Sequence, residues 1–458
     1  MYVFDAQNGK LSLPEDSGRY GMNAETTSAH TIRDDFVRIK TGFMGGINGV
    51  LYQPQKPAAG AQAAVVVVHS HDDYSTMNIA PELAKRGYRV FAGRVQHPEG
   101  LLDEKLMDIA AIIRFLKSLK GINKVILMGH SGGATLMTAY QRAAENGVAS
   151  LKTDEMLFKC TLPDETVLER ADGLMLLDAN YGNGAQTLLS IDPCVTEEGN
   201  GRKLDMSLDI YQAEAGYSDE KTVYTEEFKK KFYKAQAARN NRMIEAALAR
   251  LKSIEEGQGN FMDDEPLTIA GGAQIKPFNK LYPEDLTLLA HTKGTYRLLH
   301  GDGSFTSEQV PSLRDAMLGR PARSEAMFAT LQTTVKAFLC EHAVRALEGY
   351  GVHEDGVTGI DWDHTYNCPP GNVKHIHVPL LISGMTGSCE FMASEAIYEN
   401  AASEDKEIFF TEAADHNLAV NHRIEEYPGQ YGDVEQALYN QAADWLERKF
   451  VTKAKETL

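Results

Sequence analysis

Short apolar runs alternate with amphipathic stretches over the first part of the chain. Residues 63–68 (AAVVVV), 125–128 (VILM) and 173–177 (GLMLL) are continuous apolar runs, which is the pattern of strands buried on both faces. Between the first two runs, residues 101–119 carry apolar side chains at i, i+3 and i+4 spacing, which is typical of an amphipathic helix. Strands that alternate with helices predict an α/β fold with a mostly parallel, doubly wound sheet.

Two further strands are expected before this alternation begins. Residues 35–40 and 46–53 alternate between apolar and polar positions, which predicts an antiparallel pair joined through a glycine-containing turn. Residues 1–33 are polar and weakly periodic, so we expect them to form a lead-in on the surface.

The regular alternation stops between residues 183 and 372. This segment is polar and helix-rich, with long helices expected at 224–254 and 324–347. Buried-strand patterns resume at 378–383 and 406–411. We therefore expect a large helical cap over the carboxyl ends of the strands, where ligands bind in such sheets.

The predicted domain organisation follows from this interruption. The core has a first part, residues 1–182, and a second part, residues 373–458, which ends in a helix from about 434 to 450. The cap, residues 183–372, is inserted between the sixth and seventh predicted strands.

The most informative motif follows the apolar run at 125–128. Gly129-His130-Ser131-Gly132-Gly133 matches G-x-S-x-G in its strand–turn–helix context. So tight a turn strains the backbone at the serine and requires flanking residues without a Cβ atom. The hydroxyl then projects at a helix N-terminus, where the helix dipole favours a developing oxyanion. Ser131 is therefore the predicted nucleophile.

A serine nucleophile needs a base, and the base needs an orienting acid. His416 follows the last predicted strand directly and is the expected base. The acid should follow the preceding strand, where Glu390 is favoured and Glu395 is the second candidate. Asp178, at the end of the sixth predicted strand, is the third.

Two backbone amides are expected to form an oxyanion hole. One is the N–H of Gly132, the residue after the nucleophile, and the other is the N–H of His71, in the loop after the strand at 63–68. Tyr74 in the same loop and Trp362, shortly before the chain re-enters the sheet, are the predicted substrate-binding residues.

Together these residues resemble the α/β-hydrolase superfamily. The chain order Ser131, Glu390, His416 follows the nucleophile, acid, base order of that superfamily. The resemblance implies an α/β-hydrolase fold with a mostly parallel eight-stranded sheet flanked by helices. It also implies hydrolysis of an ester-like bond through an acyl-serine. The chain departs from the pattern of the superfamily in two places. The loop after the strand at 63–68 has His69-Ser70 in place of the usual His-Gly, and the spacing from Gly384 to Glu390 is longer than usual.

Two other functions compete with the serine hydrolase. In the first, His69, His71 and Asp73 bind a divalent metal ion through imidazole and carboxylate ligands, and the protein is a metal-dependent hydrolase. In the second, the fold is a catalytically silent ligand-binding protein. The metal hypothesis leaves the serine motif unexplained, so we expect a serine esterase without metal or cofactor.

The composition of the chain limits the classes of partner that it can bind. The net charge of −18 argues against binding to nucleic acids or anionic membranes. The apolar runs are too short to span a bilayer, no signal peptide is recognised, and the five cysteines form no paired spacing. We therefore expect a cytoplasmic enzyme with a small-molecule ester-like substrate. A homodimer is the default assembly.

Overall fold

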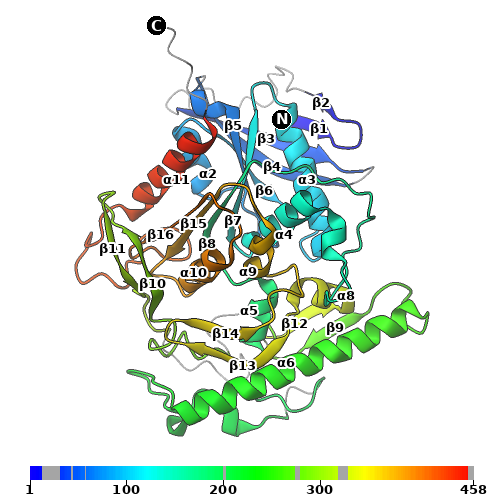
Figure 1. Cartoon of the computed structure of the whole chain (residues 1–458), viewed down its shortest axis with the longest axis vertical. Helices are drawn as coiled ribbons and strands as arrows, with labels where there is room; N and C mark the ends of the chain where they lie inside the picture. Colours follow the sequence, from blue (N-terminus) through cyan, green and yellow to red (C-terminus); the bar gives the residue numbers. More distant parts are fainter. Residues whose placement is uncertain are drawn as a thin grey trace.

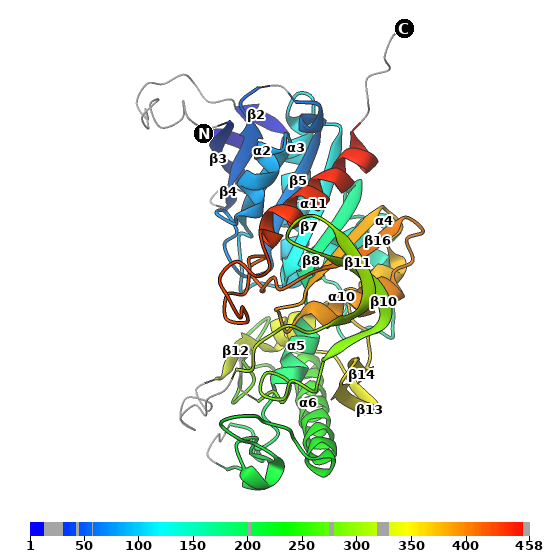
Figure 2. The ribbon, with the colours of Figure 1, turned by 90° about the vertical axis from the view of Figure 1, so that its left-hand side faces the viewer.

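A twelve-stranded sheet runs through the molecule, with helices on both faces (Figures 1 and 2). The computed structural model describes residues 1–12, 31–42, 45–56, 58–199, 203–273, 279–317 and 329–451. In spatial order the strands are β11 (Phe305–Pro311), β10 (His291–Leu299), β16 (Lys406–Thr411), β15 (Leu380–Met385), β8 (Gly173–Ala179), β7 (Lys124–Ser131), β5 (Ala63–His69), β6 (Arg89–Arg94), β4 (Gly46–Pro54), β3 (Ile32–Lys40), β1 (Tyr2–Asp5) and β2 (Lys10–Ser12).

Eight of these strands form the predicted core. From β6 through β5, β7, β8 and β15 to β16, every neighbouring pair is parallel. Strand β4 is antiparallel to both β3 and β6. The resemblance implied a mostly parallel eight-stranded sheet, and the alternation at residues 35–40 and 46–53 predicted the antiparallel pair that β3 and β4 form. The α/β-hydrolase fold is confirmed.

Both edges of the sheet extend beyond the eight expected strands. At one edge, β1 pairs in parallel with β3, so the first residues of the predicted surface lead-in belong to the sheet; residues 13–30 lie outside the described ranges. At the other edge, β10 pairs in parallel with β16 and β11 pairs with β10. These two strands come from the segment that was expected to be a cap, so part of that segment completes the sheet.

The segment between β8 and β15 is not purely helical. The expected long helix is present as α6, but the helix predicted at 324–347 is wrong where the chain is described. Its residues form a strand, a short helix, a π-helical turn and another strand. Thr333 and Thr334 favour the first strand, because β-branched side chains favour extended backbone. The elements of this segment, apart from β10 and β11, are α5 (Asn183–Ser190), α6 (Glu226–Glu255), β9 (Pro266–Ile269), β12 (Leu331–Thr334), α8 (Val335–Ala337), β13 (Ala346–His353), β14 (Gly356–Ile360) and α9 (Pro369–Asn372).

Strand β5 shows how the sheet is buried on both faces. Successive side chains of a strand point to opposite faces, so Val65 and Val67 pack with α2 and α11, whereas Val66 and Val68 pack with α3 and α4. Figure 2 shows α2 and α11 in front of the sheet. The flanking helices are α2 (Ile79–Lys85), α3 (Leu102–Ser118), α4 (Gly133–Asn146), α10 (Phe391–Asn400) and α11 (Val434–Phe450).

The carboxyl ends of the parallel strands face the segment between β8 and β15. In Figure 1, α5, α6 and the β13–β14 hairpin lie at the lower end of the molecule, beyond the ends of β7 and β8. Two tight cores hold those strand ends in fixed positions. Across the described ranges, every helix is too short or too polar to cross a bilayer.

Candidate active site

Ser131 occupies a strained turn between β7 and α4. Its φ is 53°, a left-handed conformation that non-glycine residues rarely adopt. Gly129 allows the turn because a Cβ atom there would lie 2.7 Å from the Cα of Ala134. The side chains around the turn are packed, yet Ser131 itself is only half-buried. The predicted strained turn is present, and it places a partly exposed serine at the carboxyl edge of the sheet.

Asp178 projects from the adjacent strand through a β-bulge. The β7–β8 ladder pairs His130 with Leu177 and then Ser131 with Ala179, so Asp178 is an extra residue on β8. Its φ is 42°, and the residue is fully buried. A bulge re-aims a side chain and often occurs beside active sites. Here it places a carboxylate next to the serine turn.

His416 lies in the loop after β16 and pairs with Asp178. Its Nδ1 is 2.6 Å from Asp178 Oδ2, and the other carboxylate oxygen, Oδ1, accepts the backbone N–H of Met385 at 3.0 Å. The side chain of His416 is 32% exposed, so the ring is partly accessible from outside the protein. The pair has the geometry of an acid that orients a base.

His130, the residue before Ser131, supports this histidine from behind. Its Nε2 donates to the backbone carbonyl of His416 at 2.6 Å, and the ring centroids of the two histidines are 4.7 Å apart. Burial lowers the pKa of His130 well below its ordinary value, with the positive charge of His416 acting in the same direction. His130 is therefore a neutral support that ties the His416 loop to the nucleophile turn.

The predicted acid, Glu390, takes part in a different hydrogen bond from the Asp178–His416 pair. Its Oε2 accepts a hydrogen bond from Nε2 of Gln186 at 2.6 Å, and the residue is buried at the start of α10. Glu395, the second candidate, accepts the backbone N–H groups of Lys293 and Gly294 at 3.0 and 2.8 Å and so anchors β10. The carboxylate that pairs with His416 is therefore that of Asp178, the third candidate for the acid.

A sequence signal for Asp178 existed. It is the charged residue that ends an otherwise apolar strand, and that strand neighbours the serine strand directly. Loop order along the chain favoured Glu390, whereas adjacency in the sheet favours Asp178.

Three polar atoms converge on Gly132. A Cβ atom on this residue would lie 2.9 Å from His69 Nε2, 2.9 Å from Ser70 Oγ and 3.1 Å from Asn183 Oδ1. Only a glycine leaves room for them. The predicted contribution of the Gly132 amide to an oxyanion hole stays a prediction, and the polar surroundings are compatible with it.

The backbone amide of His71 is engaged elsewhere. It donates to Nδ1 of His69 at 3.1 Å, and the N–H of Asp72 donates to the same nitrogen at 2.9 Å. The predicted second oxyanion donor therefore holds the His69 ring in place. The turn after β5 thus hydrogen-bonds to the side chain of His69, the last residue of that strand, which the sequence pattern did not predict.

The side chain of His71 connects the loop to the segment between β8 and β15. Its Nδ1 lies 2.9 Å from Ser70 Oγ, and its Nε2 lies 3.0 Å from Glu341 Oε2. The other oxygen of Glu341 pairs with Nζ of Lys105 at 2.5 Å, and both of these side chains are almost completely buried. Burial raises the pKa of Glu341, but Lys105 and His71 outweigh it and leave the pKa below its ordinary value. Glu341 is thus a carboxylate that fastens the loop.

The two predicted substrate-binding residues lie near the site. The Tyr74 hydroxyl is 2.7 Å from Nδ1 of His130, so it supports the nucleophile turn. Trp362 is half-buried and stacks on Tyr181 with ring centroids 5.9 Å apart. Tyr181 follows β8 closely, so Trp362 lies in the neighbourhood of the Asp178 bulge. Their binding roles stay predictions.

The ligand set proposed for a metal ion is not assembled. Nδ1 of His69 accepts two backbone amides, both nitrogens of His71 have partners, and Asp73 accepts from Ser75. In the described part of the chain, a different trio brings its potential ligand atoms within 4.8 Å: His71, Glu341 and His342. This trio fits a divalent ion poorly, because the buried ammonium of Lys105 already neutralises its only carboxylate.

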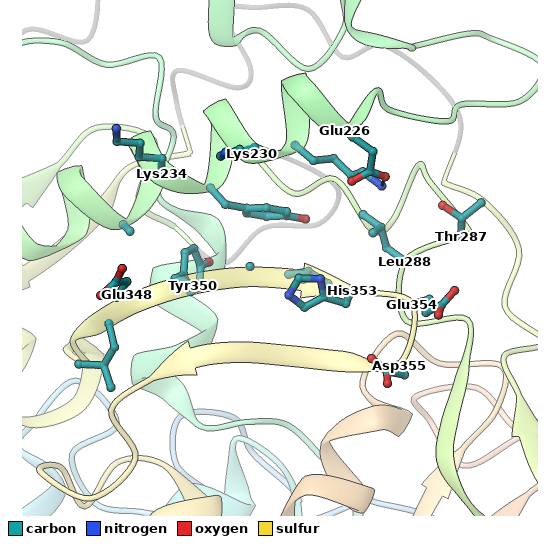
Figure 3. A pocket seen from close by; sticks show the side chains of 17 residues that line it. Glu226, Lys230, Lys234, Thr287, Leu288, Glu348, Tyr350, His353, Glu354 and Asp355 are labelled. Atoms are coloured by element: carbon teal, nitrogen blue, oxygen red, sulfur yellow. Dashed lines mark ion pairs between the residues drawn. The ribbon is translucent and has the colours of Figure 1, made fainter.

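A groove of about 970 Å³ lies apart from these residues, between α6 and the β13–β14 hairpin (Figure 3). Figure 3 shows Lys230 and Lys234 on the helix and Glu348, Glu354 and Asp355 along the hairpin. The lining includes no predicted site residue. Its mixed charges select no single class of ligand.

No family model and no curated protein matches the sequence. Solved structures do. The α/β hydrolase GrgF from Penicillium sp. sh18 is 12% identical, with 92% of this chain and 100% of that chain covered and a TM-score of 0.40. A soluble variant of monoglyceride lipase from Saccharomyces cerevisiae is 11% identical, with 92% and 96% covered and a TM-score of 0.42. Est1E from Butyrivibrio proteoclasticus is 9% identical, with 91% and 99% covered and a TM-score of 0.39.

The strand order and strand directions of this chain identify its architecture independently of those likenesses. Ser131 ends β7, Asp178 bulges from β8 and His416 follows β16, all at one edge of the sheet. The chain has the α/β-hydrolase fold.

Proposed function

We propose that this protein is a serine hydrolase that cleaves a carboxylic ester or lactone of a small-to-medium organic molecule through an acyl-serine intermediate. One observation carries the proposal. A serine with a φ of 53° ends β7, and a buried aspartate on the neighbouring strand holds a histidine at 2.6 Å. Backbone strain of this kind persists at functional sites because it exposes the nucleophile.

The chemical roles follow from the hydrogen bonds. Because Nδ1 of His416 donates to Asp178, its Nε2 is unprotonated and serves as the base. His416 takes the hydroxyl proton as Ser131 attacks the ester carbonyl, and Asp178 stabilises the imidazolium that forms. The Gly132 amide stabilises the oxyanion. His416 then protonates the leaving alcohol and activates the water that releases the acid.

The test is hydrolysis of p-nitrophenyl esters of graded acyl length by the full chain. We expect turnover that is abolished by a serine-directed phosphonate, with the adduct mass on the Ser131 peptide. The Ser131→Ala variant should lose at least about 10⁴-fold in kcat, because the nucleophile is removed. EDTA should leave the rate unchanged.

Ser118→Ala is the matched control, since Ser118 lies at the end of α3 and its hydroxyl donates to the Phe115 carbonyl of the same helix. It should keep wild-type activity. Full activity in Ser131→Ala contradicts the proposal. Loss of turnover with EDTA alone would favour the metal hydrolase, and absence of both turnover and adduct would favour the silent binding protein.

A further inference from the structure

His69 is the last residue of β5, and its ring lies beside the residue that follows the nucleophile. Nε2 is 2.9 Å from the position that a Cβ atom on Gly132 would take. The ring stacks on Tyr74, with centroids 4.9 Å apart and an interplanar angle of 24°, and the residue is only 7% exposed. Packing therefore fixes the ring with Nε2 toward the serine turn.

The hydrogen bonds of its own loop fix the tautomer of His69. The N–H groups of His71 and Asp72 both donate to Nδ1, at 3.1 and 2.9 Å. Only an unprotonated ring nitrogen accepts a hydrogen bond, so the proton of the neutral ring is on Nε2. A carboxylate oxygen of Asp72 is 3.4 Å from Nδ1, but it is farther away than both N–H groups and its side chain is 75% exposed.

The ring is also uncharged. Burial lowers the pKa of His69 to about 3, and positive charge on His71, His416 and Lys105 acts in the same direction, while Glu341 opposes them. A neutral imidazole with its proton on Nε2 offers a hydrogen-bond donor that stays in place through the reaction.

This donor is unused in the part of the chain that the structure describes, where every interaction of His69 involves Nδ1 or the ring face. A side-chain donor that is held beside the nucleophile turn without a protein partner is available to a ligand, and such groups occur at functional sites. The two backbone N–H groups of the loop therefore orient His69 so that its Nε2–H lies beside the turn that carries the nucleophile.

We propose that the Nε2–H of His69 is the second donor of the oxyanion hole and acts together with the backbone N–H of Gly132. This inference rests on the proposed function, since it assigns a residue to the same reaction. It replaces the backbone amide of His71 by the imidazole that this amide holds. The carbonyl oxygen of the substrate would lie between the two donors as its negative charge develops.

A paired substitution separates the donor from the loop. In His69→Asn, the amide oxygen takes the place of Nδ1 and still accepts both backbone N–H groups, but the donor at the Nε2 position is lost. We expect kcat for p-nitrophenyl esters to fall about 100–1,000-fold, as for removal of one oxyanion donor, with KM changed less than about threefold. Phosphonylation of Ser131 should slow as well, because the phosphonyl oxygen occupies the same hole.

His97→Asn is the matched control. His97 lies outside the site, with a nitrogen that contacts the Gln96 side chain, and its replacement should leave kcat unchanged. A His69→Asn protein that retains kcat within about threefold of the wild type would overturn the inference. If Ser131 of that variant is still labelled at the wild-type rate, the proposed function stands and only the role of His69 fails. If the wild-type Ser131 is never labelled, the proposed function fails.

A second measurement does not depend on the folding of a variant. ¹⁵N NMR of histidine-labelled wild-type protein should show His69 with a protonated Nε2 and an unprotonated Nδ1 between about pH 5 and pH 8. The Nε2 proton should move downfield when the phosphonate binds. A protonated Nδ1 contradicts the inference directly, as does a Nε2 proton that the phosphonate leaves unmoved.

Discussion

Two buried carboxylates lie at the carboxyl edge of the sheet, one at the end of β8 and one in the loop after β15. Asp178 is the bulged residue of β8, Glu390 follows β15, and the two residues are 0% and 5% exposed. Asp178 pairs with the ring of His416, whereas Glu390 accepts a hydrogen bond from Gln186 on α5. Two carboxylates of similar burial therefore have different partners, one a histidine beside the proposed nucleophile and the other an amide on α5.

Adjacency within the sheet explains the difference. Strand β8 lies directly beside β7, and the bulge lifts Asp178 out of the ladder next to the serine turn. Strand β15 is one strand farther away, and Glu390 is the residue that directly precedes α10. The position of a carboxylate in the sheet, and not its order along the chain, decides its role.

The largest effect should come from Asp178→Asn. An amide in this position favours the wrong tautomer of His416 and cannot stabilise its imidazolium, so kcat should fall by about 10⁴-fold. The measurement is steady-state hydrolysis of the best p-nitrophenyl ester, with circular dichroism to verify the fold. Retention of a tenth or more of wild-type activity would show that the comparison assigns the wrong carboxylate.

A smaller effect, on stability alone, should follow from Gln186→Leu. Leucine fills the volume of the side chain but removes a hydrogen bond to the buried carboxylate of Glu390. The free energy of unfolding should fall by about 1–3 kcal/mol, measured by urea denaturation. The kcat of the folded protein should stay at the wild-type value. A loss of kcat larger than the loss of folded protein would bring the β15 loop into catalysis.

The smallest effect should come from Glu390→Gln, which makes the same change from carboxylate to amide as Asp178→Asn. The new side chain keeps an oxygen that accepts from Gln186, so activity should remain within about threefold and stability within about 1 kcal/mol of the wild type. The two variants are assayed side by side. Equal losses of kcat would contradict the distinction between the two carboxylates.

Much of the core was predictable from sequence because its signals are local. The run at 63–68 is a strand of the core, the G-x-S-x-G turn carries a strained serine, and His416 lies in the loop after the final strand of the core. Each follows from apolar periodicity or from a turn that tolerates only certain residues. The long helix α6 was predictable for the same reason.

The remaining features depend on contacts between distant segments. The bulge at Asp178 exists only in the register of β8 against β7, which no pattern within β8 specifies. The polar sequences of β10 and β11 led to their prediction as part of the cap. They form strands because β10 pairs with the edge strand β16 and β11 pairs with β10. The hydrogen bond from the His71 amide to the ring of His69 depends on the conformation of the turn after β5.

The ion pair between Lys105 and Glu341 bears on how the two parts of this protein can be separated. Lys105 belongs to α3 in the core, and Glu341 comes from the segment between β8 and β15; both are buried. A replacement segment that covers Lys105 without supplying a carboxylate would leave its ammonium group buried and unpaired, at a cost of about 3–5 kcal/mol. The segment is therefore not a module that evolution or an engineer can exchange freely, and any transplanted replacement must bring its own counter-charge for Lys105.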